Sequence, residues 1–279
     1  MTISIPDTLT TDNSEKYSVS IRLSSGGLSF SGYDTLTSGH FFYRSVEFDR
    51  SKPFLASLKE FFFAHSFLAY TYKHTYVVCV SPEYALVPDA MFDEDQQERM
   101  QSFNFSAPQA HCLSNPLKEE HARLLFGMDE EVYEFCSRSL ANPRFVHSVT
   151  PLLCLWKRQS SHQLSKKMYV VIHRKAMDVV CYAQGKLLFA NSFEAEQSSD
   201  RLYYILHVWR QVGMNQLKDQ LFLSGETVLR TGVEQTLQAY LQNIALIEIP
   251  SEAYLMGTDV AKAPADLIAL ATCEGLLFT

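Results

Sequence analysis

The order of strand-like and helix-like stretches repeats along the chain, and this repeat limits the folds that the sequence can adopt. Apolar residues alternate with polar ones from Tyr17 to Leu23, which is the period of a strand with one buried face. Two more strands, a helix with a broad apolar face and a continuous apolar strand follow, and the same order returns in the second half. The predicted strands are 17–23, 28–33, 41–48 and 76–80 in the first half, and 169–172, 177–182, 187–193 and 221–223 in the second. The repeat predicts a duplicated α/β fold.

Turn and cap residues separate these elements. Paired glycines in 25–27 suit the positive φ angles of a tight hairpin turn. Ser51 is a candidate cap for the first helix, and Pro53 is tolerated in its first turn. A second helix over 198–212 has Gly213 in the position that commonly ends a helix.

Further elements lie outside the two copies and complete the predicted organisation. They are an acidic helix at 89–101, strands near His111 and Leu124, a helix at 129–140, a strand at 145–149, helices at 150–156 and 232–241, a strand at 246–249 and a helix at 265–270. We predict a polar lead-in at 1–16, a first lobe with an inserted segment at 17–160 and a second lobe at 161–279.

Composition restricts the partners and the location of the protein. Hydrophobic residues make up 47% of the 279 residues, so the chain can bury a large core. The formal net charge of -7 argues against nucleic acid as a partner, because nucleic-acid affinity comes largely from clustered Lys and Arg. No stretch approaches the ~20 apolar residues that span a bilayer, and the first residues lack the pattern of a secretory signal. The six scattered cysteines are typical of free thiols in a reducing compartment, so we predict a cytoplasmic protein.

Several familiar catalytic and metal-binding motifs are absent from the sequence. The chain has no CxxC pair and no H-E-x-x-H helix, so no zinc site is predicted. G-x-G-x-x-G, P-loop and G-x-S-x-G patterns are also missing. The sequence therefore identifies no catalytic residue and no metal ligand.

The element order resembles the actin-like ATPase superfamily, in which each lobe contains a ribonuclease-H-like β-β-β-α-β-α unit. Within it, the chain is most similar to the bacterial pilus-assembly and type II secretion members, and it also resembles an uncharacterised bacterial family with this fold. The resemblance implies an α/β protein with two actin-like lobes, each a mixed sheet with flanking helices.

The phosphate loops of that superfamily are altered in this chain. In such ATPases the first hairpin of each lobe typically reads Asp-x-Gly-(Ser/Thr), and the aspartates hold magnesium. Arg22 occupies the expected aspartate position in the first lobe, and the matching stretch of the second lobe is Ile172-His173-Arg174-Lys175. Magnesium needs oxygen ligands, so the resemblance predicts neither a metal site nor efficient hydrolysis.

A nucleotide contact remains open at four positions. The stretch 221–226 resembles the adenosine-contact segment of the superfamily and keeps one glycine, and the first hairpin keeps small residues near the expected phosphate loop. The predicted nucleotide contacts are Ser24, Ser25, Gly26 and Gly225.

These observations leave more than one function open. Our leading hypothesis is a non-catalytic actin-like module without a cofactor, which binds a protein partner within a bacterial assembly. The alternative is a switch that binds ATP or a related nucleotide between the lobes without efficient hydrolysis, with Arg22 as the counter-charge. An unusual phosphotransferase ranks third, and a metal-holding carboxylate in the folded cleft would favour it.

Overall fold

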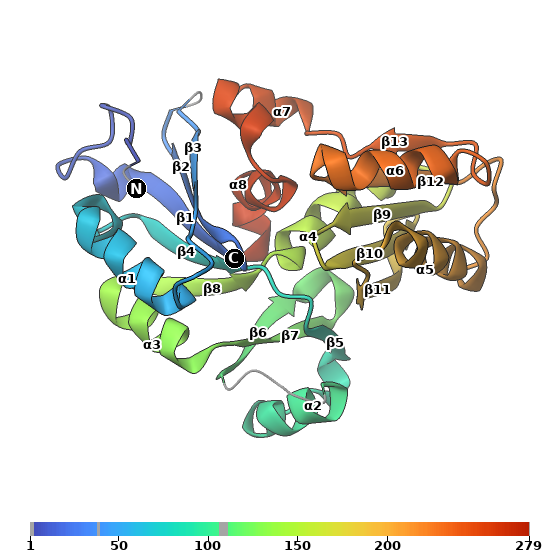
Figure 1. Cartoon of the computed structure of the whole chain (residues 1–279), viewed down its shortest axis with the longest axis horizontal. Helices are drawn as coiled ribbons and strands as arrows, with labels where there is room; N and C mark the ends of the chain where they lie inside the picture. The colour runs from blue at the N-terminus through green and yellow to red at the C-terminus, as the bar shows by residue number, and fades with distance from the viewer. Residues whose placement is uncertain (1–2, 38–39, 106–110, 279) are drawn as a thin grey trace.

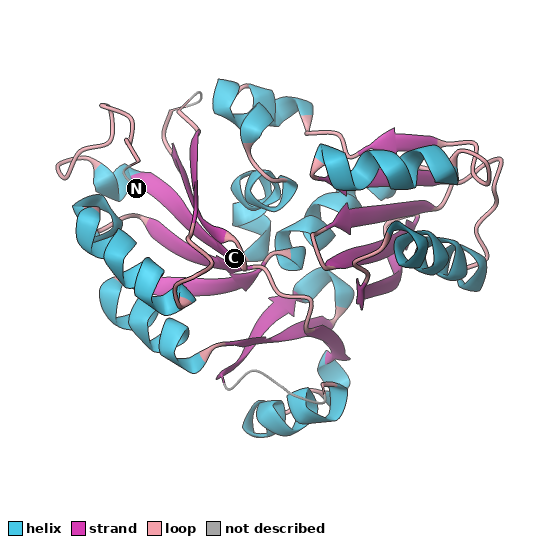
Figure 2. Cartoon of the chain, viewed as in Figure 1, coloured by secondary structure: helices cyan, strands magenta, loops and turns pink. Residues whose placement is uncertain are grey.

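Two five-stranded sheets lie side by side in the molecule, with helices α4 (Val149–Ser160) and α8 (Ala265–Leu277) between them (Figure 1). The computed structural model describes residues 3–37, 40–105 and 111–278. Further helices cover the outer faces of both sheets, as the colouring by secondary structure shows (Figure 2). The central helices therefore form the connection between the two halves.

The two sheets have the same strand order. In the first sheet the order is β3-β2-β1-β4-β8, and in the second it is β11-β10-β9-β12-β13. The first three strands of each are antiparallel and the other two run parallel to the central one. The strands are Tyr17–Ser24 (β1), Gly27–Asp34 (β2), Phe42–Glu47 (β3), His74–Cys79 (β4), Pro143–His147 (β8), Lys167–Ile172 (β9), Ala176–Ala183 (β10), Lys186–Glu194 (β11), Gln220–Gly225 (β12) and Ile244–Leu246 (β13). The predicted duplication is confirmed.

Helices complete each half. On the outer faces lie α1 (Phe54–Ala64) and α3 (Glu130–Ser139) in the first half, and α5 (Ser198–Gln211) and α6 (Thr227–Leu237) in the second (Figure 1). The short helix α7 (Ser251–Tyr254) precedes α8. Among the helices of the described residues, none has the length and apolarity needed to span a membrane.

The central strand of the second sheet is buried on both faces. Met168 and Val170 face the core beneath α5 and α6. On the opposite face, Tyr169 stacks on Trp156 of α4, with ring centroids 4.6 Å apart, and on Phe222 of β12 at 5.2 Å. Burial on both sides explains why this strand reads as a continuous apolar run and not as an alternating one.

A small third sheet is inserted between β4 and α3. It has the order β5-β7-β6, with β5 at Tyr84–Pro88, β6 at His111–Leu117 and β7 at Ala122–Met128, and it also carries α2 (Gln97–Asn104). Buried Asn115 of β6 connects it to the first half. Its Nδ2 donates to the carbonyl of Phe145 at 2.9 Å, and its Oδ1 accepts from the backbone N–H of His147 at 2.8 Å and from Thr150 Oγ1 at 2.9 Å.

Three local predictions are wrong. The acidic stretch 89–101 is not one helix: two 3-10 turns precede α2, and the Asp93 side chain accepts from the N–H of Asp95 and favours the tighter turn. Ser51 does not cap α1, which begins after Pro53 without a side-chain cap. The strand predicted at 246–249 ends at Leu246, and β5 was not predicted at all.

Two polar contacts hold α8 on the first sheet. Arg22 of β1 is bonded to Asp266 near the start of the helix, and Ser18 is bonded to Glu274 near its end. Four residues of a strand extend about 13 Å and eight residues of a helix extend about 12 Å. Because these spans match, both contacts form at once, with the helix lying along the strand.

Glu274 is surrounded by donors from three strands. Its Oε1 accepts from Ser18 Oγ at 2.9 Å, from Tyr76 OH at 2.7 Å and from His74 Nδ1 at 2.6 Å, and its Oε2 accepts from Tyr33 OH. Burial by itself raises the pKa of this carboxyl, but the hydrogen bonds together outweigh burial and lower it. The ionised carboxylate therefore stabilises the packing of α8 on the sheet.

Replacement of this carboxylate tests the contact. At about pH 7, Glu274→Gln should lower the free energy of unfolding by about 2 kcal/mol, because charge-assisted hydrogen bonds are lost. The pKa of Glu274 lies below its usual value of 4.5, so its contribution is present above that pH and is lost as the pH falls through the folded pKa. Urea unfolding at a series of pH values should show the difference from wild type shrinking in acid.

The exposed Glu15 provides the control for this experiment, and Glu15→Gln should leave the unfolding curve unchanged at every pH. A wild-type advantage over Glu274→Gln that stays constant into acid would contradict the assignment.

Candidate functional site between the two hairpins

The carboxyl ends of β1 and β9 both point towards the middle of the molecule, between the sheets (Figure 1). Each strand turns there into the next one, through residues 25–26 in the first half and 173–175 in the second. Strand β12 runs parallel to β9 and places Gly225 beside Ile172, next to the second turn. In the described part of the chain, no hydrogen bond joins Gly225 to the first turn.

Gly225 is required by the sheet in which it lies. Its φ is +126°, and a Cβ atom at this position would be 2.4 Å from the carbonyl oxygen of Ile172. Only glycine fits so close an approach of two backbones. The packing of β12 on β9 therefore accounts for this glycine without a ligand, and its contact with a nucleotide stays a prediction.

Of the paired glycines in the first turn, the backbone requires Gly27 and not Gly26, which is the predicted nucleotide contact. Gly27 has a φ of +153°, and a Cβ there would lie 2.1 Å from the carbonyl oxygen of Val46 on β3. Gly26 has neither a positive φ nor any atom within 4 Å of a Cβ position. Ser24 Oγ donates to the carbonyl of Gly27 at 3.4 Å, and Ser25 is exposed. The expectation of positive φ at both glycines was wrong for Gly26.

Alanine substitutions at Gly225 and at Gly26 distinguish a glycine that the backbone requires from one that it does not require. Gly225→Ala should lower the free energy of unfolding by about 3 kcal/mol, because it adds a clash with Ile172 to backbone strain. Gly26→Ala should change it by less than about 0.5 kcal/mol, because the space is open. Chemical unfolding of both variants checks this, and equal effects would contradict the geometry.

Arg22 forms an ion pair across the molecule. Its Nε lies 2.6 Å from Oδ2 of Asp266, and the two side chains are only 16% and 4% exposed. This contact balances the charge of Arg22 within the chain. The guanidinium at the expected aspartate position is therefore already occupied by a carboxylate of α8.

The second turn is held by a histidine, an aspartate and a buried arginine. His173 Nε2 lies 2.7 Å from Oδ2 of Asp178 on β10, whose side chain is 3% exposed. Arg201 of α5 is buried and donates to the carbonyls of His173 at 3.3 Å, Arg174 at 3.0 Å and Ala195 at 2.9 Å. The turn is thus fixed from beneath by α5.

Asp178 was missed by our reading of the sequence. A single carboxylate inside an apolar strand needs a partner, and His173 lies five residues before it, so a signal was present. Asp178 Oδ1 is buried and has no hydrogen-bond partner among the described residues. Alignment to the superfamily loops could not reveal it, because it lies on the second strand of the hairpin.

His147 at the end of β8 is completely buried and neutral. Its Nε2 donates to the carbonyl of Ser81 at 2.9 Å, and its Nδ1 accepts from the N–H of Val149 at 3.2 Å, which caps the start of α4. Complete burial lowers the pKa of His147 to about 4, against the opposing effect of Asp178.

The two carboxylates at this site are committed to partners of the chain itself. Asp266 is bound by Arg22 and Asp178 by His173. Among residues 3–37, 40–105 and 111–278, no three His, Cys, Asp or Glu side chains are grouped so that they could hold a metal ion. The middle of the molecule is therefore a network of internal contacts.

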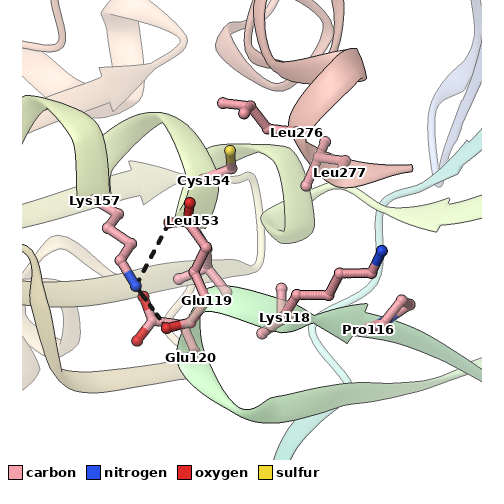
Figure 3. A pocket seen from close by; sticks show the side chains of 10 residues that line it. Pro116, Lys118, Glu119, Glu120, Leu153, Cys154, Lys157, Leu276 and Leu277 are labelled. Carbon is pink, nitrogen blue, oxygen red and sulfur yellow. Dashed lines mark hydrogen bonds and ion pairs between the residues drawn. The ribbon is translucent and has the colours of Figure 1, made fainter. Parts of the chain in front are cut away.

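A groove lies on another side of α4. It runs between α4, the end of α8 and the end of β6 (Figure 3). Lys157 Nζ donates to the carbonyl of Glu119 at 2.7 Å and lies 3.2 Å from Oε1 of Glu120. The lining residues are Pro116, Leu117, Lys118, Glu119, Glu120, Leu153, Cys154, Lys157, Leu276 and Leu277.

The duplicated sheets and the helices between them define an actin-like ATPase architecture. A protein from Bacteroides thetaiotaomicron with an actin-like ATPase fold and unknown function has a similar structure, with a TM-score of 0.82 and 31% identity over 97% of this chain and 100% of the other. The chain belongs to the family described as "Protein of unknown function (DUF3822)", whose model matches residues 6–244. The resemblance to the superfamily, and to an uncharacterised bacterial family within it, is confirmed.

Other solved structures are more distant. The PilM-PilN type IV pilus biogenesis complex matches with a TM-score of 0.49 and 13% identity, over 93% of this chain and 97% of the other. The ethanolamine utilization protein EutJ from Carboxydothermus hydrogenoformans matches with a TM-score of 0.39 and 7% identity, over 88% and 89%. No curated protein matches the chain.

Proposed function

We propose that this protein is an actin-like module that does not hydrolyse ATP and that works by binding another protein in a bacterial cytoplasm. The pairing of both central carboxylates supports the proposal that the protein does not hydrolyse ATP. Asp266 is engaged by Arg22 and Asp178 by His173, where an ATPase of this fold holds magnesium and phosphate.

Recruitment of these carboxylates to magnesium would be costly. Asp266 would have to leave Arg22, whose side chain is 16% exposed, and an uncompensated buried charge costs about 3 kcal/mol. His173 occupies Oδ2 of Asp178 and leaves only the buried Oδ1 without a partner. Phosphoryl transfer depends on charges placed in advance for the reaction, so this arrangement opposes it.

A nucleotide-binding switch is the second candidate, and the open first turn favours it. Ser25 is exposed, and the space around Gly26 is empty. Backbone N–H groups of such a turn can approach a phosphate without a metal ion. In this candidate, Ser24 and Gly225 complete the contacts with the nucleotide.

Thermal unfolding with and without millimolar ATP, in magnesium and in a chelator, distinguishes the candidates. A ligand at ~100 times its Kd adds about 2.7 kcal/mol, which raises the midpoint by several degrees. We expect no shift in either condition. A shift that survives chelation would replace our proposal with the nucleotide switch, and a shift that needs magnesium would point to the phosphotransferase and call for a turnover assay.

Exposed phenylalanines support the protein-binding part of the proposal. The Phe63 side chain on α1 is 96% exposed and Phe103 on α2 is 91% exposed. Both lie away from the two hairpins, and large aromatic side chains are enriched where proteins meet.

Substitution of these two residues tests for a partner. Phe63→Ser and Phe103→Ser should change the free energy of unfolding by less than about 0.5 kcal/mol, because neither ring is buried. Cross-linking in the source cells, followed by mass spectrometry, should identify a partner with wild type that at least one variant loses. If both variants retain every cross-linked protein, the phenylalanines are not the binding surface.

A further inference from the structure

Two cysteines meet where α4 packs on α8. Cys154 on α4 is half-buried and lines the groove, with its side chain on the side of the helix that faces Leu276 of α8 (Figure 3). Cys273 on α8 is completely buried. Arg158, one helical turn after Cys154 on the same side of α4, contacts Sγ of Cys273, so both cysteines lie in the interface where α4 packs on α8.

A cation and a hydroxyl complete the cluster. Nη1 of Arg158, four residues after Cys154, lies 3.8 Å from Sγ of Cys273, and Oγ1 of Thr272 lies 3.9 Å from it. The hydrogen bond from Cys154 lowers the pKa of Cys273 against the effect of burial, and Arg158 lowers it further. The same contact raises the pKa of Cys154, so Cys273 is the more acidic thiol of the pair.

The other thiols have different surroundings. Burial raises the pKa of Cys136 and Cys181 to about 12, which keeps both protonated and inert. Burial also raises the pKa of Cys112 to about 11, although this residue is half-buried like Cys154. Cys112 is therefore a matched control for exposure without activation.

We propose that Cys154 and Cys273 form a redox-active dithiol that closes a disulfide between α4 and α8 when it meets a small disulfide such as an oxidised low-molecular-weight thiol. Cys154 is the residue that the reagent reaches from the groove, and Cys273 is the residue that resolves the product. This site is separate from the two hairpins and does not depend on the proposed function.

The exchange balances in two steps. The sulfur of Cys154 attacks one sulfur of the small disulfide, releases the first small thiolate and passes its proton to Cys273. After that proton is lost, the Cys273 thiolate attacks Sγ of Cys154 and releases the second small thiolate. The small disulfide is reduced by two electrons and the two cysteines are oxidised by two electrons.

Closure would fix the central helices to each other. Helix α4 is attached to the second sheet, where Trp156 stacks on Tyr169, and α8 is attached to the first sheet through Glu274. A disulfide between them would therefore set the position of one half of the molecule against the other. Redox state would control any motion between the halves.

Mass spectrometry of the full chain tests the site with oxidised glutathione as the probe. After incubation, acid quenching and alkylation, wild type should lose the mass of two hydrogen atoms, and digestion should yield one linked pair of peptides containing Cys154 and Cys273. Cys273→Ser should stop at a glutathione adduct on Cys154, and Cys154→Ser should not react. Cys112→Ser should behave as wild type.

Substitution of Arg158 distinguishes an influence on the thiol chemistry from a purely structural role, because only the former changes how disulfide closure depends on pH. Arg158→Gln should shift the pH dependence of closure to higher pH, because the pKa of Cys273 rises, and Arg158→Lys should restore most of the wild-type profile. Melting curves of the reduced variants check that each variant is folded. Disulfide closure in wild type tests the proposal even if a variant fails to fold. A stable glutathione adduct on wild-type Cys154, or no reaction at all, would overturn the proposal.

Discussion

The attachment of α8 to the first sheet by paired polar groups holds the molecule together. The last long helix of the chain lies on the first sheet, where Arg22 meets Asp266 and Ser18 meets Glu274. Charged groups at such a depth require partners, because an unpaired one loses its solvation without compensation. Since α4 lies between α8 and the second sheet, the same contacts determine how the two halves are joined and which side chains meet in the middle.

The middle of the molecule shows how one architecture supports different electrostatics. In the ATPases that the fold resembles, this region holds a metal ion and phosphate. Here Arg22 pairs with Asp266 and His173 with Asp178, and neutral His147 accepts a hydrogen bond at the start of α4. A fold positions groups without dictating their chemistry, so function has to be argued from these contacts. The proposed dithiol lies outside these two ion pairs, between the central helices.

Much of the fold was predictable because the strands bury regular faces. Alternation along β1 and the apolar runs of β9 and β12 indicated the strands and the order in which they follow one another along the chain. The errors fell where a local hydrogen bond or a short element decided the structure, as in the turns around Asp93 and at Ser51, which does not cap α1. At the candidate site, the glycines were identified from the sequence, but the reason for Gly225 is the carbonyl of Ile172 on the neighbouring strand.

The sequence by itself determined the duplicated order of elements and the basic character of both hairpins, because hydrophobic period and residue type are local properties. Only the tertiary structure decided that Arg22 is neutralised by Asp266, 244 residues later, and that Cys154 and Cys273 both lie where α4 packs on α8. No local pattern carries such pairings. They exist because two helices distant in sequence are packed between the same two sheets, where a buried charge without a partner is costly.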